Sequence, residues 1–168
     1  MNHGFSRFAL RYLLTLGLGL GLVALHGAGG VLTALVPGCA SPWELSKLLY
    51  WPLLGALVLE RVLSGAAAGS ARCLPALTLA PAVLLVTVWI LTPPELLSGG
   101  VFALVWLVCC GAGLALAPHW KLTDRQRGIL RVLAAAWGVA YVLFALFPPA
   151  WGPFLDPASA AAMATIPC

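Results

Sequence analysis

Long apolar segments without a charged residue constrain this chain more than any other feature. No charged residue occurs between Arg11 and Glu44. Charged residues make up 8% of the chain, whereas a soluble domain carries roughly 25%. The hydrophobic share of 62% also excludes a disordered chain, because disordered chains are polar and highly charged. The sequence therefore predicts an all-α integral membrane helical bundle, with one transmembrane domain over residues 1–168.

The gaps between charges place the membrane spans. A spanning helix takes about 20 residues, so the chain holds about five spans and no sizeable soluble domain. We expect these spans at residues 8–28, 43–63, 73–91, 96–117 and 129–147. Residues 29–40 are apolar but interrupted by glycine and proline. This segment is predicted to be re-entrant or an interfacial loop, and irregular backbone is tolerated there only where other protein covers it.

The basic residues predict the orientation in the membrane. Nine Lys and Arg outnumber five Asp and Glu. Eight of the nine flank the predicted spans on one side, and only Lys47 falls on the other side. The eight are Arg7, Arg11, Arg61, Arg72, Lys121, Arg125, Arg127 and Arg131. Because basic residues near span ends face the cytoplasm, we expect the N-terminus inside and the C-terminus outside, in the cell (inner) membrane.

Three predicted helix starts share the capping-box pattern, a serine or threonine followed three residues later by glutamate or glutamine. They lie at residues 41–44, 92–95 and 123–126. In this motif the two side chains satisfy backbone N–H groups of the first helical turn. Capping is therefore the structural interpretation of Glu44 and Glu95.

Two ionisable residues inside the second predicted span need a further explanation. Lys47 lies one turn after Glu44, so the two can form an i,i+3 ion pair with Lys47 reaching outward, or mark a site. Glu60 follows Lys47 after only 12 uncharged residues, about 18 Å of helix, so an ionisable group must enter the hydrocarbon. Glu60 is expected either at the interface or buried with a partner. Glu44 and Glu60 are about 160° apart around the helix, so they face different neighbours.

The candidate binding site is at the predicted outer face. His26 closes the first span, Glu44 and Lys47 open the second, and Asp156 lies in a proline-rich tail that could cover the helix ends. No nucleophile–base pattern or metal-ligand cluster occurs, so we assign no catalytic residue, metal or cofactor. Cys39 and Cys168 are both expected outside, and their pairing stays open.

Other features predict helix packing. Pro52 and Pro81 lie within predicted spans, where each removes a helical hydrogen bond. Gly17 and Gly21 share one face of the first span, which permits close packing against another helix or a second copy of the chain.

The stretch from Ser41 to Pro52 resembles a family of small bacterial multi-pass membrane proteins of unknown function. That family carries a Ser-x-Trp-Glu-His-x-Lys segment entering its second span, then a proline and a glutamate. The matching positions here are Trp43, Glu44, Lys47, Pro52 and Glu60. His26 and the tail residues Pro148, Pro149, Asp156 and Pro157 also match, so the outline covers the whole chain.

The chain lacks several polar residues that the family carries in this segment. The family's Asn-Glu before the serine is Cys39-Ala40 here, and its histidine after Trp-Glu is Leu45. The resemblance therefore implies where a site lies, but it implies no activity. The replacement of these polar residues by Cys39, Ala40 and Leu45 argues against a metalloenzyme.

Three hypotheses about function follow. The first is a protein that binds or moves a small molecule or lipid through an outward-facing polar pocket. The second, ranked equal, is a structural or accessory subunit of a membrane complex whose polar residues pair locally and which has no pocket. A membrane-embedded lipid-modifying enzyme ranks behind both. The expected partners are the lipid bilayer, a small-molecule or lipid ligand, and a second copy or another membrane protein. Nucleic acid is not expected.

Overall fold

The computed structural model describes residues 3–25, 32, 34–37, 41–64, 72–91, 99–147, 149 and 152–154. Within these ranges every regular element is helical. The long helices are α1 (His3–Ala24), α2 (Pro42–Ser64), α4 (Leu74–Leu91), α5 (Gly99–Leu116) and α6 (Asp124–Leu146), with short 3-10 turns η2 (Ala117–His119) and η3 (Gly152–Phe154). The predicted all-α bundle is confirmed.

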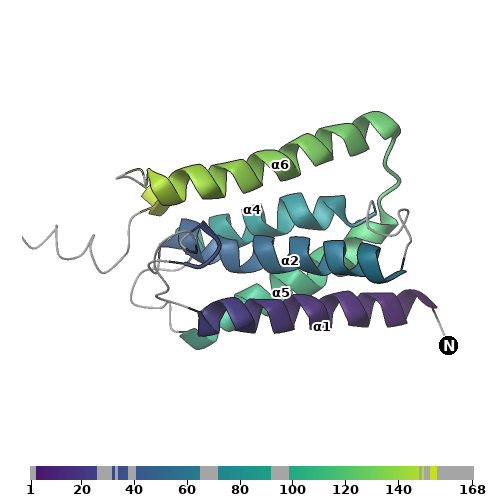
Figure 1. The fold of residues 1–168 in the computed structure, drawn as a ribbon, viewed down its shortest axis with the longest axis horizontal. Helices are drawn as coiled ribbons and strands as arrows, with labels where there is room; N and C mark the ends of the chain where they lie inside the picture. The colour runs from purple at the N-terminus through teal and green to yellow at the C-terminus, as the bar shows by residue number, and fades with distance from the viewer. Residues whose placement is uncertain are drawn as a thin grey trace, which may run out of the picture.

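The helices run alternately up and down the bundle. α2 packs between α1 and α4, α6 packs on the far side of α4, and α5 contacts both α4 and α1 (Figure 1). This order makes α2 the central helix, and its residues supply much of the buried core.

Three helices are long and apolar enough to cross a membrane: Phe5–Ala24, Gly99–His119 and Asp124–Leu146. The segment Leu74–Ile90 is a shorter apolar helix. Many large apolar side chains on these helices point outward, which suits hydrocarbon rather than water. The chain is therefore a helical membrane protein.

Of the three predicted capping boxes, one is complete and the serine half of a second is present. Ser41 Oγ accepts a hydrogen bond from the N–H of Glu44 at 3.2 Å, at the start of α2. Thr123 and Gln126 form a complete capping box at the start of α6. These caps are local in sequence, which is why the pattern finds them. The predicted cap at 92–95 lies outside the described residues.

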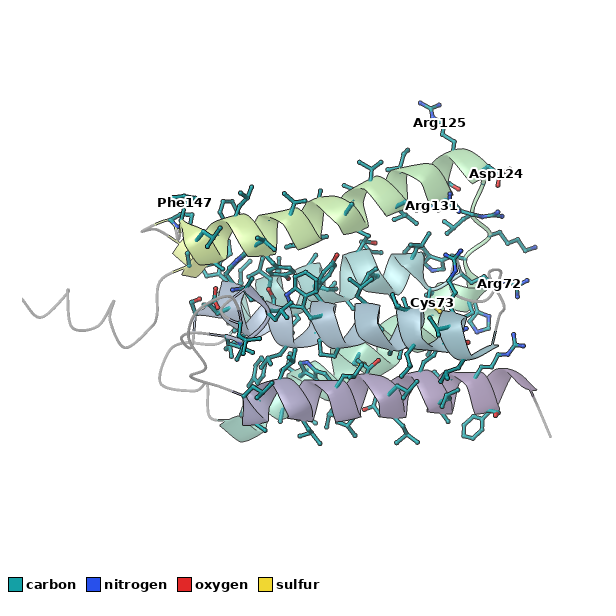
Figure 2. The ribbon with its side chains drawn as sticks, in the orientation of Figure 1. Arg72, Cys73, Asp124, Arg125, Arg131 and Phe147 are labelled. Atoms are coloured by element: carbon teal, nitrogen blue, oxygen red, sulfur yellow. The ribbon has the colours of Figure 1, made fainter. Side chains whose placement is uncertain are left out.

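The two ends of the bundle differ in chemistry. We call the end where α2 begins the aromatic end, because the rings of Trp43, Trp137, Phe144 and Phe154 pack together there. The opposite end, where Arg72 and Arg125 lie, is called the basic end (Figure 2). The exposed basic residues that belong to its helices and loops are Arg7, Arg61, Arg72, Lys121, Arg125, Arg127 and Arg131.

Candidate functional site

The partly buried Glu44 and the fully buried Lys47 form an ion pair in the first turns of α2. The Lys47 Nζ lies 2.6 Å from Glu44 Oε1, and the side chains are 0% and 13% exposed, respectively. The predicted i,i+3 pair is therefore present, but the interpretation that Lys47 reaches outward is wrong. An ammonium group removed from solvent needs an opposite charge beside it, and Glu44 supplies that charge.

Aromatic rings from α6 and η3 pack around Trp43 at the start of α2. Trp43 contacts Trp137, Tyr141 and Phe144 of α6, and Phe154 of η3. Ring pairs of this kind contribute beyond their buried area. The cluster therefore joins η3 and α6 to the first turn of α2.

Hydrogen bonds fix the same region. The hydroxyls of Ser46 and Tyr141 lie 2.8 Å apart, and Ser46 also donates to the Trp43 carbonyl at 2.7 Å. Within the described part of the chain, the buried Nε1 of Trp43 has no hydrogen-bond partner.

Two of the four predicted site residues are thus brought together. His26 and Asp156 lie outside the described residues, so the convergence of all four stays a prediction. The ion pair itself is explained by its position on consecutive turns of one helix. What the sequence did not predict is the aromatic surroundings, which come from residues about a hundred positions further along the chain.

Glu60 pairs with Arg11, which the sequence analysis used only to predict the orientation in the membrane. Arg11 Nε and Nη2 donate to the two carboxylate oxygens of Glu60 at 2.7 and 2.8 Å, and Nη1 donates to Cys73 Sγ at 3.0 Å. Both charged side chains are below 10% exposed, at 7% and 9%. Of the two predicted settings of Glu60, burial with a partner is confirmed and the interface is wrong. The sequence feature that could have predicted this pair is that Arg11 and Glu60 each place a charge inside an otherwise apolar helix.

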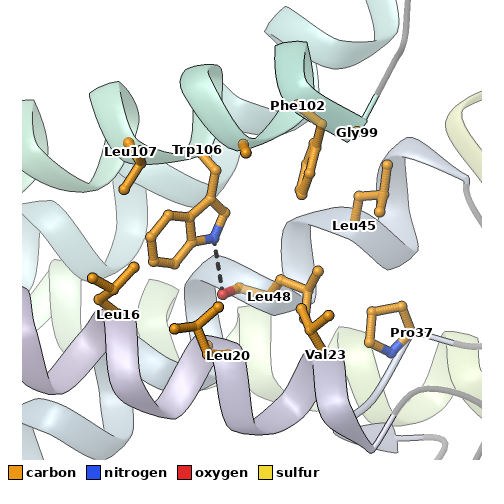
Figure 3. A pocket seen from close by; sticks show the side chains of 12 residues that line it. Leu16, Leu20, Val23, Pro37, Leu45, Leu48, Gly99, Phe102, Trp106 and Leu107 are labelled. Atoms are coloured by element: carbon orange, nitrogen blue, oxygen red, sulfur yellow. Dashed lines mark hydrogen bonds between the residues drawn. The ribbon is translucent and has the colours of Figure 1, made fainter.

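A cavity of about 650 Å³ lies between α1, α2 and α5 towards the aromatic end (Figure 3). Its lining is apolar and contains neither Glu44 nor Lys47. The lining residues are Leu16, Gly19, Leu20, Val23, Pro37, Leu45, Leu48, Gly99, Phe102, Ala103, Trp106 and Leu107. The predicted pocket was polar, whereas the cavity found here is bounded by hydrocarbon side chains.

The cavity has an exposed rim and a buried floor. On the rim, Leu20 and Val23 of α1 are 62% and 51% exposed, and Ala103 of α5 is also exposed. On the floor, Leu48 and Trp106 are buried. The cavity therefore opens sideways between α1 and α5, and α2 closes its back.

Pro52 explains the position of one floor residue. Proline has no N–H, so the carbonyl of Leu48, four residues earlier in α2, receives no helical hydrogen bond from it. The indole Nε1 of Trp106 donates to this carbonyl at 3.0 Å (Figure 3). The predicted break at Pro52 is thus satisfied by a side chain from α5.

Gly17 and Gly21 do not pack against another described helix of the chain, and their packing against a second copy stays a prediction. A methyl group added at Gly17 or Gly21 meets no atom within 4 Å, and both positions are exposed. The packed glycine is Gly19, where an added Cβ would lie 3.2 Å from Trp106 Cζ2. The reason is the rotation of α1 about its axis, because Gly19 faces α5 while Gly17 and Gly21 face away from the bundle.

Comparison of the chain with protein-family models, with curated proteins and with solved structures found no match. Within the described ranges, no group of three His, Cys, Asp or Glu side chains lies close enough to hold a metal ion. The free cysteines there are Cys73, Cys109 and Cys110. Cys39 and Cys168 fall outside those ranges. The features of the described residues that bear on function are the cavity and the two ion pairs.

Proposed function

We propose that the chain is a multi-pass protein of the cell membrane that binds the apolar tail of a membrane lipid in the cavity between α1, α2 and α5. The observation that carries this proposal is the combination of an apolar lining with a sideways opening. The volume of about 650 Å³ falls within the range of roughly 300–1,000 Å³ that small-molecule sites occupy.

A lipid tail suits this cavity better than water or a polar solute. Ordered water needs two to four polar partners, and the lining offers mainly hydrocarbon. The rim belongs to α1 and α5, two helices apolar enough to cross a membrane. At that depth the surrounding phase is hydrocarbon, so a tail can enter from the side without crossing water.

In this proposal the lipid head group lies at the level of the ion pair. Glu44 and Lys47 occupy the same turns of α2 as Leu45 and Leu48, which line the cavity. In the proposal, the tail lies in the cavity and the head group stays near the aromatic end. His26 and Asp156 are the candidate head-group contacts, while Glu44 and Lys47 lie outside the cavity lining and Lys47 is fully buried.

The proposal includes five spans, an N-terminus in the cytoplasm and a C-terminus outside, as in a bacterial inner membrane. The gathering of exposed arginines at the basic end supports this orientation. Fusing a reporter that is active only outside the cytoplasm to the C-terminus tests it. Activity of that fusion, with none from an N-terminal fusion, is the expected result.

The binding proposal is tested by filling the cavity. The purified protein is incubated with vesicles of phosphatidylethanolamine and phosphatidylglycerol, re-extracted in mild detergent and weighed by native mass spectrometry. We expect a retained phospholipid in the unaltered protein, and its loss in an Ala103→Phe variant. Ala112→Phe, at an exposed position of α5 away from the cavity, is the matched control. Equal retention in both variants would contradict the proposal.

An accessory subunit remains the second candidate; the cavity goes against its expectation of no pocket, but a different observation favours it. The ion pairs Glu44–Lys47 and Arg11–Glu60 are both formed inside the chain. That hypothesis expects a clean apo mass in the experiment above, and co-purification of a membrane-protein partner after chemical crosslinking in cells.

A further inference from the structure

Trp106 occupies the inner end of the cavity. On α5 the lining runs from Gly99 at the aromatic end to Trp106 and Leu107 in the middle of the bundle, about 12 Å along the helix axis. Leu16 on α1 lies at the same inner end (Figure 3). A tail that enters from the side and lies along the cavity, with its head at the aromatic end, therefore meets the Trp106 indole where the cavity closes.

Three helices each supply a feature that holds this indole in place. From α2, the Leu48 carbonyl accepts its Nε1 hydrogen bond at 3.0 Å, and Pro52 leaves that carbonyl available. From α1, Gly19 leaves room for the ring, because an added Cβ would lie 3.2 Å from Cζ2. From α5 comes the side chain itself, which is only 7% exposed. A ring fixed on all these sides is a rigid wall rather than a mobile cover.

We propose that Trp106 sets the depth of the cavity and thereby the length of the lipid tail that it accepts. This inference rests on the proposed function. A tail longer than the cavity must overpack against the indole, while a shorter one leaves a void, and both weaken binding. One methylene more or less in an apolar pocket changes affinity by roughly tenfold or more.

The test compares tail-length preference between variants. The detergent-solubilised protein is incubated with an equimolar mixture of lysophosphatidylglycerols carrying lauroyl, myristoyl, palmitoyl or stearoyl chains, and the bound species are resolved by native mass spectrometry. The unaltered protein is expected to prefer one length. Trp106→Leu deepens the cavity and is expected to raise the ratio of stearoyl to myristoyl lipid bound by about tenfold.

A second substitution tests the same wall from α1. Gly19→Ala forces the indole or the new methyl group into the cavity, so we expect a shift towards shorter chains, opposite in direction to that of Trp106→Leu. Gly21→Ala is the matched control on the same helix, since nothing lies within 4 Å of a Cβ there. Its preference should equal that of the unaltered protein.

The outcomes separate the two proposals. Lysolipid binding with the same length preference in the unaltered protein, Trp106→Leu and Gly19→Ala overturns the role of Trp106 and leaves lipid binding standing. Absence of every lysolipid from the unaltered protein overturns lipid binding and the depth role together. Opposite shifts in the two variants support both, and Gly19→Ala retains the tryptophan if Trp106→Leu does not fold.

Discussion

The guanidinium of Arg11 binds the carboxylate of Glu60 through two hydrogen bonds of 2.7 and 2.8 Å, and both side chains are buried. The pair joins the first helix to the second across 49 positions of sequence. Two parallel N–H···O bonds give this contact a defined geometry as well as a compensated charge.

Arg11→Met should destabilise the protein strongly, because it leaves a buried carboxylate without its guanidinium. The expected loss is about 3–5 kcal/mol in the free energy of unfolding. Changing Glu60→Leu as well should recover much of the loss, since no uncompensated charge then remains. Thermal unfolding in detergent measures both. Arg61→Met, at the exposed neighbouring position, is the control and should change little.

Lys47→Met should have a comparable effect at the other end of α2. Lys47 is fully buried beside Glu44, so its removal leaves Glu44 without the ammonium group. The expected loss is about 3–5 kcal/mol in the free energy of unfolding. Glu44→Gln in the same chain should restore part of the stability. The Arg127–Asp124 pair has the same i,i+3 spacing, but its side chains are 45% and 96% exposed. Arg127→Met should therefore cost less than about 1 kcal/mol, and an equal cost at the two sites would contradict the importance of burial.

Trp106 and Pro52 should be coupled energetically. In the unaltered protein, Trp106→Phe removes a donor to the Leu48 carbonyl and is expected to cost about 1–3 kcal/mol. In a Pro52→Ala background the new backbone N–H can bond that carbonyl, so the same change should cost about 1 kcal/mol less. A double-mutant cycle of thermal stabilities measures this difference. Trp89→Phe, at an exposed position of α4, should show no coupling with Pro52→Ala.

Gly138→Ala should be destabilising because of one buried hydroxyl. A Cβ at Gly138 would lie 2.9 Å from Tyr50 Oη, which donates to the Ala134 carbonyl at 2.6 Å. Displacing this ring should cost about 1–3 kcal/mol.

Two further variants check the cause of that loss. In a Tyr50→Phe background the penalty of Gly138→Ala should disappear, because the clashing oxygen is gone. Gly128→Ala, in the same helix with open space around it, should stabilise by up to about 1 kcal/mol through helix propensity. Destabilisation of similar size at both glycines would contradict the steric argument.

The features that could be predicted from the sequence are local ones. The helices follow from apolar segments of membrane length, and the caps at Ser41 and Thr123 follow from spacings within one turn. The contact of Glu44 with Lys47 is likewise an i,i+3 pair of a single helix. The partner of Glu60 could not be identified, because Arg11 was one of many basic residues and pairing across helices depends on their rotation.

The amino-acid sequence by itself determined that this is a helical membrane protein with its basic residues gathered towards one end, because hydrocarbon excludes charge and requires backbone hydrogen bonds to be made within each segment. Only the tertiary structure decided that Lys47 is buried rather than outward, that Gly19 rather than Gly17 or Gly21 is packed, and that a cavity ends at Trp106. Each of these depends on which face a helix turns towards its neighbours. That choice is made by side chains far apart in the sequence, and a pattern along one helix does not contain it.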